Sequence, residues 1–135
     1  MAEEFVQKKK TIDLEPFPYF VHFIVTNDVP QSELLYRRSN GDTSPVTSGK
    51  NTGAVTLTTR DLQKLTIVMP FRCDIGIIAH EVCHVVNKLF QFVGAKYEAE
   101  VWAYYQGWIT REAAKFCYKV SDLNKKVDKP VEVLL

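Results

Sequence analysis

The chain has 135 residues, the size of one domain, and 46% of them are hydrophobic and 24% charged. This composition can bury a core, which excludes a chain that is disordered over its whole length. Seventeen basic and sixteen acidic residues leave a formal net charge of +1, and that balance gives no sign of a nucleic-acid partner or an anionic membrane.

The cysteines and the start of the chain favour a cytoplasmic protein. Cys73, Cys83 and Cys117 form no CxxC pair and cannot all be paired within one chain, so reduced thiols are the simpler interpretation. Residues 1–10 carry two early acids and no apolar run behind their lysines, unlike a signal peptide. The longest apolar stretches are too short or too interrupted to span a bilayer.

The first part of the chain predicts one strand and a long loop. The three lysines at 8–10 are expected to be a solvated chain end. Residues 19–26 are dense in aromatic and β-branched side chains, which predicts a strand. Residues 31–38 fit either a short helix or a strand. Residues 39–53 hold three glycines and many small polar side chains, which predicts a surface loop that could cover a cleft.

A hairpin and two helices are expected next. Strand-like runs at 54–59 and 65–69 are joined by a connection short enough for an antiparallel hairpin. Asp74 suits the N-cap of an apolar-periodic helix that ends near residue 92, with Gly94 as its C-terminal cap. A second helix is expected from 96 or 97 to about 118 or 120. The predicted fold class is therefore α+β, with a small antiparallel sheet packed on two long helices.

The first of these helices carries an HExxH motif, His80, Glu81 and His84. At about 100° per residue the two histidines differ by about 40° and one turn, so both imidazoles leave the same face and can chelate one zinc ion. Glu81 lies about 60° from His84, beside such a metal, where a carboxylate can take a proton from a water that the zinc makes acidic.

The surrounding residues support this interpretation of the motif. Apolar side chains cover one side of the helix and the two histidines lie on the other, so one face packs and the opposite face presents ligands. The apolar set is Ile78, Ala79, Val82, Val85, Val86, Leu89 and Phe90.

The second helix offers two carboxylates as a third ligand. Glu98 and Glu100 lie about 160° apart, so both cannot point at one metal. Glu100 shares its face with Tyr104 and Gly107, and this glycine would allow close approach of the helices. We therefore expect Glu100 as the ligand, with Glu98 as the alternative. Tyr104 could donate a hydrogen bond to an oxyanion, support Glu100, or simply pack.

Two further residues have ordinary explanations. Cys83, inside the motif, is expected to be a small buried thiol rather than a ligand. His22 lies in the predicted strand and is expected to be a hydrogen-bonded core histidine.

The motif and the glutamate on the following helix resemble the zincin metallopeptidases of the glutamate-ligand (gluzincin) type. Residues 77–109 more narrowly resemble small metallopeptidases predicted in phages and prophages, in which an AHExxH-like helix precedes a Glu-x-x-Ala-Tyr helix, here residues 100–104. The resemblance implies that His80, His84 and Glu100 bind Zn²⁺ and that Glu81 is the catalytic base. It also implies an antiparallel edge strand beside the active-site helix, for which residues 65–69 are the candidate.

These observations predict a single zincin-like domain over residues 1–135 that acts as a zinc-dependent hydrolase on a peptide bond, with Glu81 and Tyr104 as catalytic residues. We expect a peptide or protein substrate and a cytoplasmic location, which would be the host cytoplasm for a phage-encoded protein. The alternatives are a non-catalytic zincin-like module that sequesters a partner and an amidase for a non-peptide amide. Oligomeric state stays open.

Overall fold

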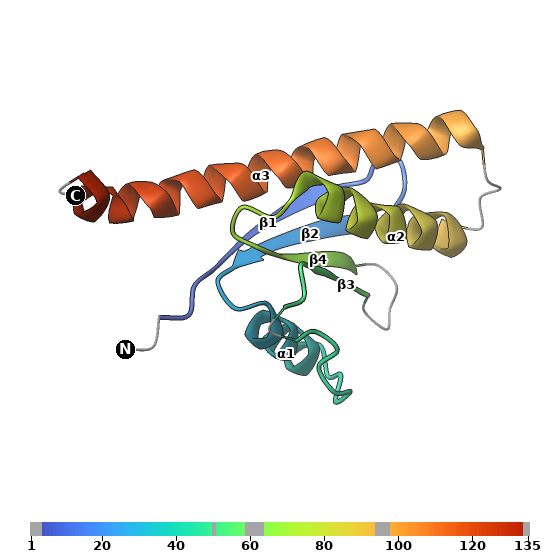
Figure 1. Ribbon diagram of the computed structural model, residues 1–135. Coiled ribbons are helices and arrows are strands. Elements are labelled where there is room, and N and C mark those ends of the chain that lie inside the picture. The colour runs from blue at the N-terminus through green and yellow to red at the C-terminus, as the bar shows by residue number, and fades with distance from the viewer. Residues whose placement is uncertain (1–3, 50, 59–63, 94–97, 134–135) are drawn as a thin grey trace.

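The computed structural model describes the backbone of residues 4–49, 51–58, 64–93 and 98–133, with side chains as far as Leu123. Within these residues four strands and three helices form an α+β fold (Figure 1), which confirms the predicted class. In chain order the elements are β1 (Gln7–Asp13), β2 (Phe20–Thr26), α1 (Val29–Ser39), β3 (Val55–Thr58), β4 (Lys64–Pro70), α2 (Ile75–Val93) and α3 (Ala99–Val133).

The sheet is mixed, with strand order β1-β2-β4-β3. The expected antiparallel hairpin of β3 and β4 is present, with Val55 opposite Val68, but β2 and β4 run parallel. The prediction of a wholly antiparallel sheet was therefore wrong. The chain leaves β2, crosses through α1 to the far edge at β3, and turns back into β4 beside β2, so β2 and β4 point the same way.

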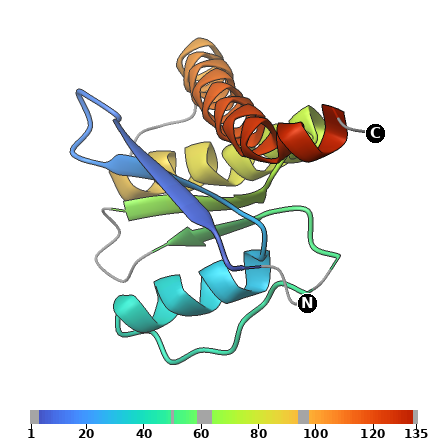
Figure 2. The ribbon, with the colours of Figure 1, turned by 90° about the vertical axis from the view of Figure 1, so that its left-hand side faces the viewer.

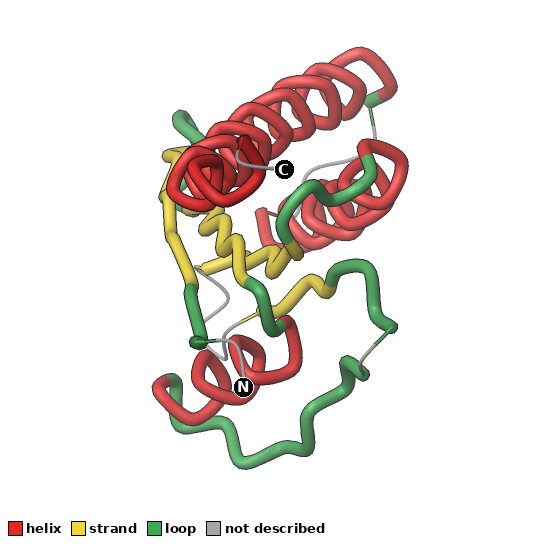
Figure 3. The backbone as a smooth tube through the Cα atoms, turned by 60° about the vertical axis from the view of Figure 1, so that its left-hand side comes forward, coloured by secondary structure: helices red, strands yellow, loops and turns green. Residues whose placement is uncertain are grey.

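The helices lie on both faces of the sheet. Figures 1 and 2 show α2 and α3 on one face and α1 on the other. The larger core fills the space under α2 and α3, and a smaller cluster, including Val29 of α1 and Val68 of β4, lies on the opposite face. The tube in Figure 3 shows the same layers from another side. None of the described helices combines the length and the apolar character that crossing a bilayer requires.

Segment 31–38, which fitted either a helix or a strand, is part of helix α1. The Asp28 side chain accepts a hydrogen bond from the Gln31 amide at 3.1 Å, and Pro30 occupies the first turn. An N-cap followed by proline is a strong helix initiator, because the cap accepts a hydrogen bond from a first-turn amide and proline has no amide N–H that would stay unpaired.

Strand β1 is the element that the sequence did not reveal. Lys8, Lys9 and Lys10 are not a solvated chain end but the exposed middle of an edge strand, and only Ile12 of β1 is buried. Charged edge strands of this kind lack the alternating apolar pattern by which strands are predicted, and their lysines repel a second copy of the same strand.

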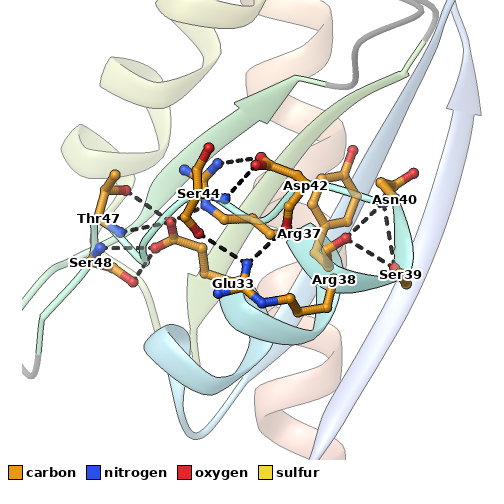
Figure 4. A network of polar contacts seen from close by, with 10 residues as sticks. Glu33, Arg37, Arg38, Ser39, Asn40, Asp42, Ser44, Thr47 and Ser48 are labelled. Atoms are coloured by element: carbon orange, nitrogen blue, oxygen red, sulfur yellow. Dashed lines mark hydrogen bonds and ion pairs between the residues drawn. The ribbon is translucent and has the colours of Figure 1, made fainter.

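The loop at 39–53 is anchored on α1. The buried carboxylate of Glu33 accepts hydrogen bonds from the backbone and hydroxyl of both Thr47 and Ser48, and it also pairs with Arg37 at 2.7 Å (Figure 4). The loop thus packs on the face of the sheet away from α2 over this stretch, so these residues do not cover the histidine motif.

The first and last residues of the two long helices agree with the prediction only in part. At α2, Asp74 accepts from the Gly76 amide at 2.9 Å, as an N-cap does, while Gly94 and the expected start of the next helix at 96–97 lie outside the described residues. The hairpin connection at 59–63 lies outside them too. Helix α3 does not end near residue 120 but continues to Val133.

Candidate active site

The HExxH histidines converge at the exposed face of α2. His80 Nε2 and His84 Nε2 are 3.3 Å apart, and the rings meet edge to face with centroids 4.9 Å apart. Two nitrogens on a tetrahedral zinc ion, each at about 2.0–2.1 Å, are about 3.3–3.4 Å apart. The two nitrogens therefore have the spacing that a shared zinc ion requires. They can come this close because residues four apart on a helix lie on the same face, about one turn apart.

Glu81 lies beside this pair and is held from the sheet. The residue is 9% exposed. Its Oε1 accepts a hydrogen bond from Thr56 Oγ1 at 2.7 Å, while its Oε2 lies 3.8 Å from His80 Nε2. One carboxylate oxygen is thus fixed by β3 and the other faces the histidines.

Thr56 is a site residue that sequence reasoning missed. It lies on the short strand β3, and its hydroxyl also lies 3.2 Å from the Glu81 carbonyl oxygen. Strand alternation places Thr56 and Thr58 on one face of β3, but the sequence does not show that this face meets α2.

A hollow of about 390 Å³ runs between β3 and α2, lined by Ala54, Val55, Thr56, Thr58, Glu81, His84 and Lys88. It follows the outer edge of β3, which pairs only with β4 among the described strands. The substrate-side edge strand was expected at 65–69, and that prediction was wrong. Residues 65–69 belong to β4, which lies between β2 and β3 and has both edges hydrogen-bonded.

The side of α3 that carries Glu100 and Tyr104 faces outward. Glu100 is exposed, and Tyr104 is 65% exposed with its ring against Tyr105 and Trp108. Gly107 has open space where a side chain would begin, so it does not serve a close helix contact as expected. The reason is the apolar stripe of α3 at intervals of four residues, which takes the opposite side into the core. Its members are Tyr105, Ile109, Ala113 and Cys117.

Among the described residues, polar contacts also join helices α2 and α3. Trp102 Nε1 donates to Asn87 Oδ1 at 3.3 Å, and Gln106 Nε2 donates to the Ala79 carbonyl at 3.0 Å. Asn87, one turn beyond Cys83, thus bridges the helices.

Glu98 serves as the N-cap of α3. Its two carboxylate oxygens accept from the Glu100 amide at 3.1 Å and from the Val101 amide at 2.9 Å. Within the part of the chain that the structure describes, no three His, Cys, Asp or Glu side chains form a group that could hold a metal ion. The structure therefore brings together His80, Glu81 and His84, and it leaves Glu98, Glu100 and Tyr104 outside that group.

The two residues with ordinary explanations lie as follows. His22 Nδ1 is 2.7 Å from Thr11 Oγ1 across the β1–β2 pair, which confirms the hydrogen bond, but the residue is half-buried and does not lie in the core as expected. Burial, with Lys64 and Lys9 nearby, lowers the pKa of His22. Cys83 is half-buried and accepts a weak contact from the Asn87 amide at 3.9 Å.

Comparisons of this chain with protein-family models, with curated proteins and with solved structures gave no match.

Proposed function

We propose that the protein is a zinc-dependent hydrolase that cleaves a peptide bond. The observation that carries the proposal is the 3.3 Å approach of His80 Nε2 and His84 Nε2 beside a buried glutamate whose second oxygen faces them. An ordinary exposed pair of histidines would not need a carboxylate anchored at their side.

The proposed metal ligands are His80, His84 and, as the third, a carboxylate from the start of α3. Glu100 is the ligand that the family resemblance implies, and Glu98 is the alternative. Two imidazoles and a carboxylate suit zinc and the commoner transition metals.

When bound, zinc would polarise the substrate carbonyl and make a water acidic near neutral pH. Glu81 takes the proton at Oε2, since Thr56 occupies Oε1. The Thr56 hydrogen bond keeps this carboxylate from turning away, which holds the proposed general base beside the histidines. Tyr104 is proposed to steady the developing oxyanion, and Tyr104→Phe tests this role.

An extended peptide is the proposed substrate because β3 offers an open strand edge along the hollow beside Glu81 and His84. A peptide can add to such an edge through main-chain hydrogen bonds, with its side chains turned alternately to the hollow and away from it. A cytoplasmic location is part of the proposal, supported by three free cysteines.

The deciding experiment measures the metal content of protein purified without chelators or metal-affinity resin. We expect about one zinc per chain, lost in His84→Ala and in the variant of the third ligand, with Glu112→Ala as a control on the same helix. A peptide library should then be cleaved by the wild type and not by Glu81→Gln. A folded sample that takes up no added zinc would overturn the proposal.

The second candidate function is a partner-sequestering module without catalysis. It is favoured by the outward position of Glu100 and Tyr104 on α3. The result that would favour this module is one zinc per chain without cleavage of any library peptide. The Glu81→Gln variant should then have the same zinc content and the same lack of cleavage as the wild type.

A further inference from the structure

A second hollow, larger than the one beside Glu81, lies at the opposite edge of the sheet. It has a volume of about 1130 Å³ and lies between β1 and the later part of α3. Five of its ten described lining residues are lysines: Lys8, Lys9, Lys10, Lys115 and Lys119. We call it the basic groove.

The basic groove follows the outer backbone edge of β1. Lys8 and Lys10 are paired with Val25 and Phe23, which belong to the larger core under α2 and α3, while Lys9 is paired with Ile24 on the other face. A hollow that touches all three consecutive residues must run along the strand rather than over one face. Among the described strands β1 pairs only with β2, so its outer amides and carbonyls have no strand partner.

The rest of the groove wall is apolar. Phe71 precedes α2, and Phe116, Val120 and Leu123 come from α3, with Leu123 52% exposed. Carboxylates are absent from the described lining, although Glu112 lies 3.7 Å from the ammonium of Lys115. The chain as a whole carries a net charge of only +1, so positive charge is concentrated at this place.

We propose that the basic groove binds an extended acidic segment of a partner protein, which adds to the sheet as a strand beside β1. On the face of the segment that is turned toward α3, carboxylates meet the lysines and apolar side chains cover Phe116, Val120 and Leu123. The open edge supplies main-chain hydrogen bonds, as in other cases of strand addition. A nucleic acid fits less well because its phosphates leave the apolar wall uncovered, and a lipid makes no use of the strand edge.

The test uses a fluorescent peptide of about eight residues, the length of an ordinary strand. Asp-Asp and Val-Val pairs alternate in it, so that each face of the strand presents both kinds of side chain. Its binding is followed by fluorescence anisotropy at low and at high salt. Matched peptides with Ser or Lys in place of Asp test the charge, and a peptide methylated at alternate backbone amides tests the strand pairing. An oligothymidine and phosphatidylserine vesicles test the other polyanions.

We expect binding of the Asp-Val peptide that weakens with salt. It should weaken about tenfold in Lys8→Glu/Lys10→Glu and in Lys119→Glu, which corresponds to about 1.4 kcal/mol. Lys64→Glu, an exposed lysine at the start of β4, should bind as the wild type does. These lysines are exposed, and neutral Lys→Gln variants with an intermediate loss provide a second series if a reversal disturbs folding.

Equal binding by the groove variants and Lys64→Glu would overturn the proposal. So would binding of oligothymidine or vesicles without binding of the acidic peptide. Undiminished binding of the methylated peptide would overturn the addition to β1. None of these results depends on zinc or on peptide cleavage, so the groove and the proposed hydrolase can fail separately.

Discussion

Replacing Glu33 by glutamine removes a buried negative charge that ties the loop after α1 to that helix. Glu33 is 0% exposed and receives five hydrogen bonds from three residues, the backbone and hydroxyl groups of Thr47 and Ser48 and the guanidinium of Arg37 (Figure 4). Glutamine has nearly the same shape, but its amide nitrogen would face donors in place of an acceptor. The substitution therefore tests the charge with little change in packing.

The size of the effect follows from the pKa. Burial alone would raise the pKa of Glu33, but the hydrogen bonds from Ser48, Thr47 and Arg37 outweigh it and lower the pKa to about 2. The difference from the ordinary value of 4.5, at about 1.4 kcal/mol for each pH unit, corresponds to about 3 kcal/mol of stability. Because the folded-state pKa is the lower one, this stability is complete above pH 4.5 and is lost as the pH falls toward 2.

Urea unfolding of the wild type and Glu33→Gln between pH 7 and pH 2 measures this contribution. We expect the variant to be about 3 kcal/mol less stable at pH 7, with the gap closing between pH 4.5 and pH 2. Glu112→Gln, which removes a partly exposed ion pair with Lys115, should cost less than about 1 kcal/mol. A gap that stays constant over this pH range, or one below about 1 kcal/mol at pH 7, would refute the assigned role of the charge.

Three further predictions concern the region around β3 and α2. Thr56→Val should lower the rate of peptide cleavage about tenfold to a hundredfold, because the catalytic carboxylate loses its anchor, whereas Thr56→Ser should keep the rate. An unchanged rate in Thr56→Val would contradict this role. Gly53→Ala should lower the free energy of unfolding by about 1 kcal/mol, because its added Cβ would lie 2.8 Å from Ile77 Cδ1. Adding Ile77→Val should restore that stability in thermal unfolding, and a loss that persists in the double variant would place the strain elsewhere. Burial raises the pKa of Cys73 to about 12, so at pH 8 a thiol reagent should modify half-buried Cys83 first. Bound zinc should slow that reaction, and rapid labelling of Cys73 in the native protein would contradict the packing.

What the sequence predicts well here is what depends on neighbours along one element. The meeting of His80 and His84 follows from helical geometry alone, and the structure agrees because nothing but α2 is needed. The N-cap role of Asp74 is equally local. What it predicts poorly depends on which strands meet. The place of residues 65–69 inside the sheet follows from the crossover through α1, and β1 is a strand only because it pairs with β2.

The position of Glu100 shows the same limit. A helical wheel tells which residues share a face, and Glu100 does share one with Tyr104 and Gly107. It does not tell which face meets the neighbouring helix. The apolar stripe through Tyr105 and Ile109, on the other side of α3, decides which face packs inward. Burying these aromatic and aliphatic side chains stabilises the fold far more than a close helix contact at Gly107 would.

Zinc would therefore recruit Glu100 only through a local change at the start of α3. Turning the whole helix would expose Tyr105 and Ile109, at about 1.5–3 kcal/mol for each large side chain. Unwinding the first turn loses mainly the Glu98 cap, about 1 kcal/mol, which is small beside the binding free energy of a structural zinc site, about 10–16 kcal/mol.

If Glu100 is the ligand, Glu98→Ala removes the cap that opposes this unwinding and should tighten zinc binding about fivefold, while Glu100→Ala should abolish zinc binding. If Glu98 is the ligand, Glu98→Ala should abolish zinc binding and Glu100→Ala should leave it unchanged. Competitive titration against a chromogenic chelator distinguishes the two, and equal zinc affinity in both variants and the wild type would exclude a ligand from the start of α3.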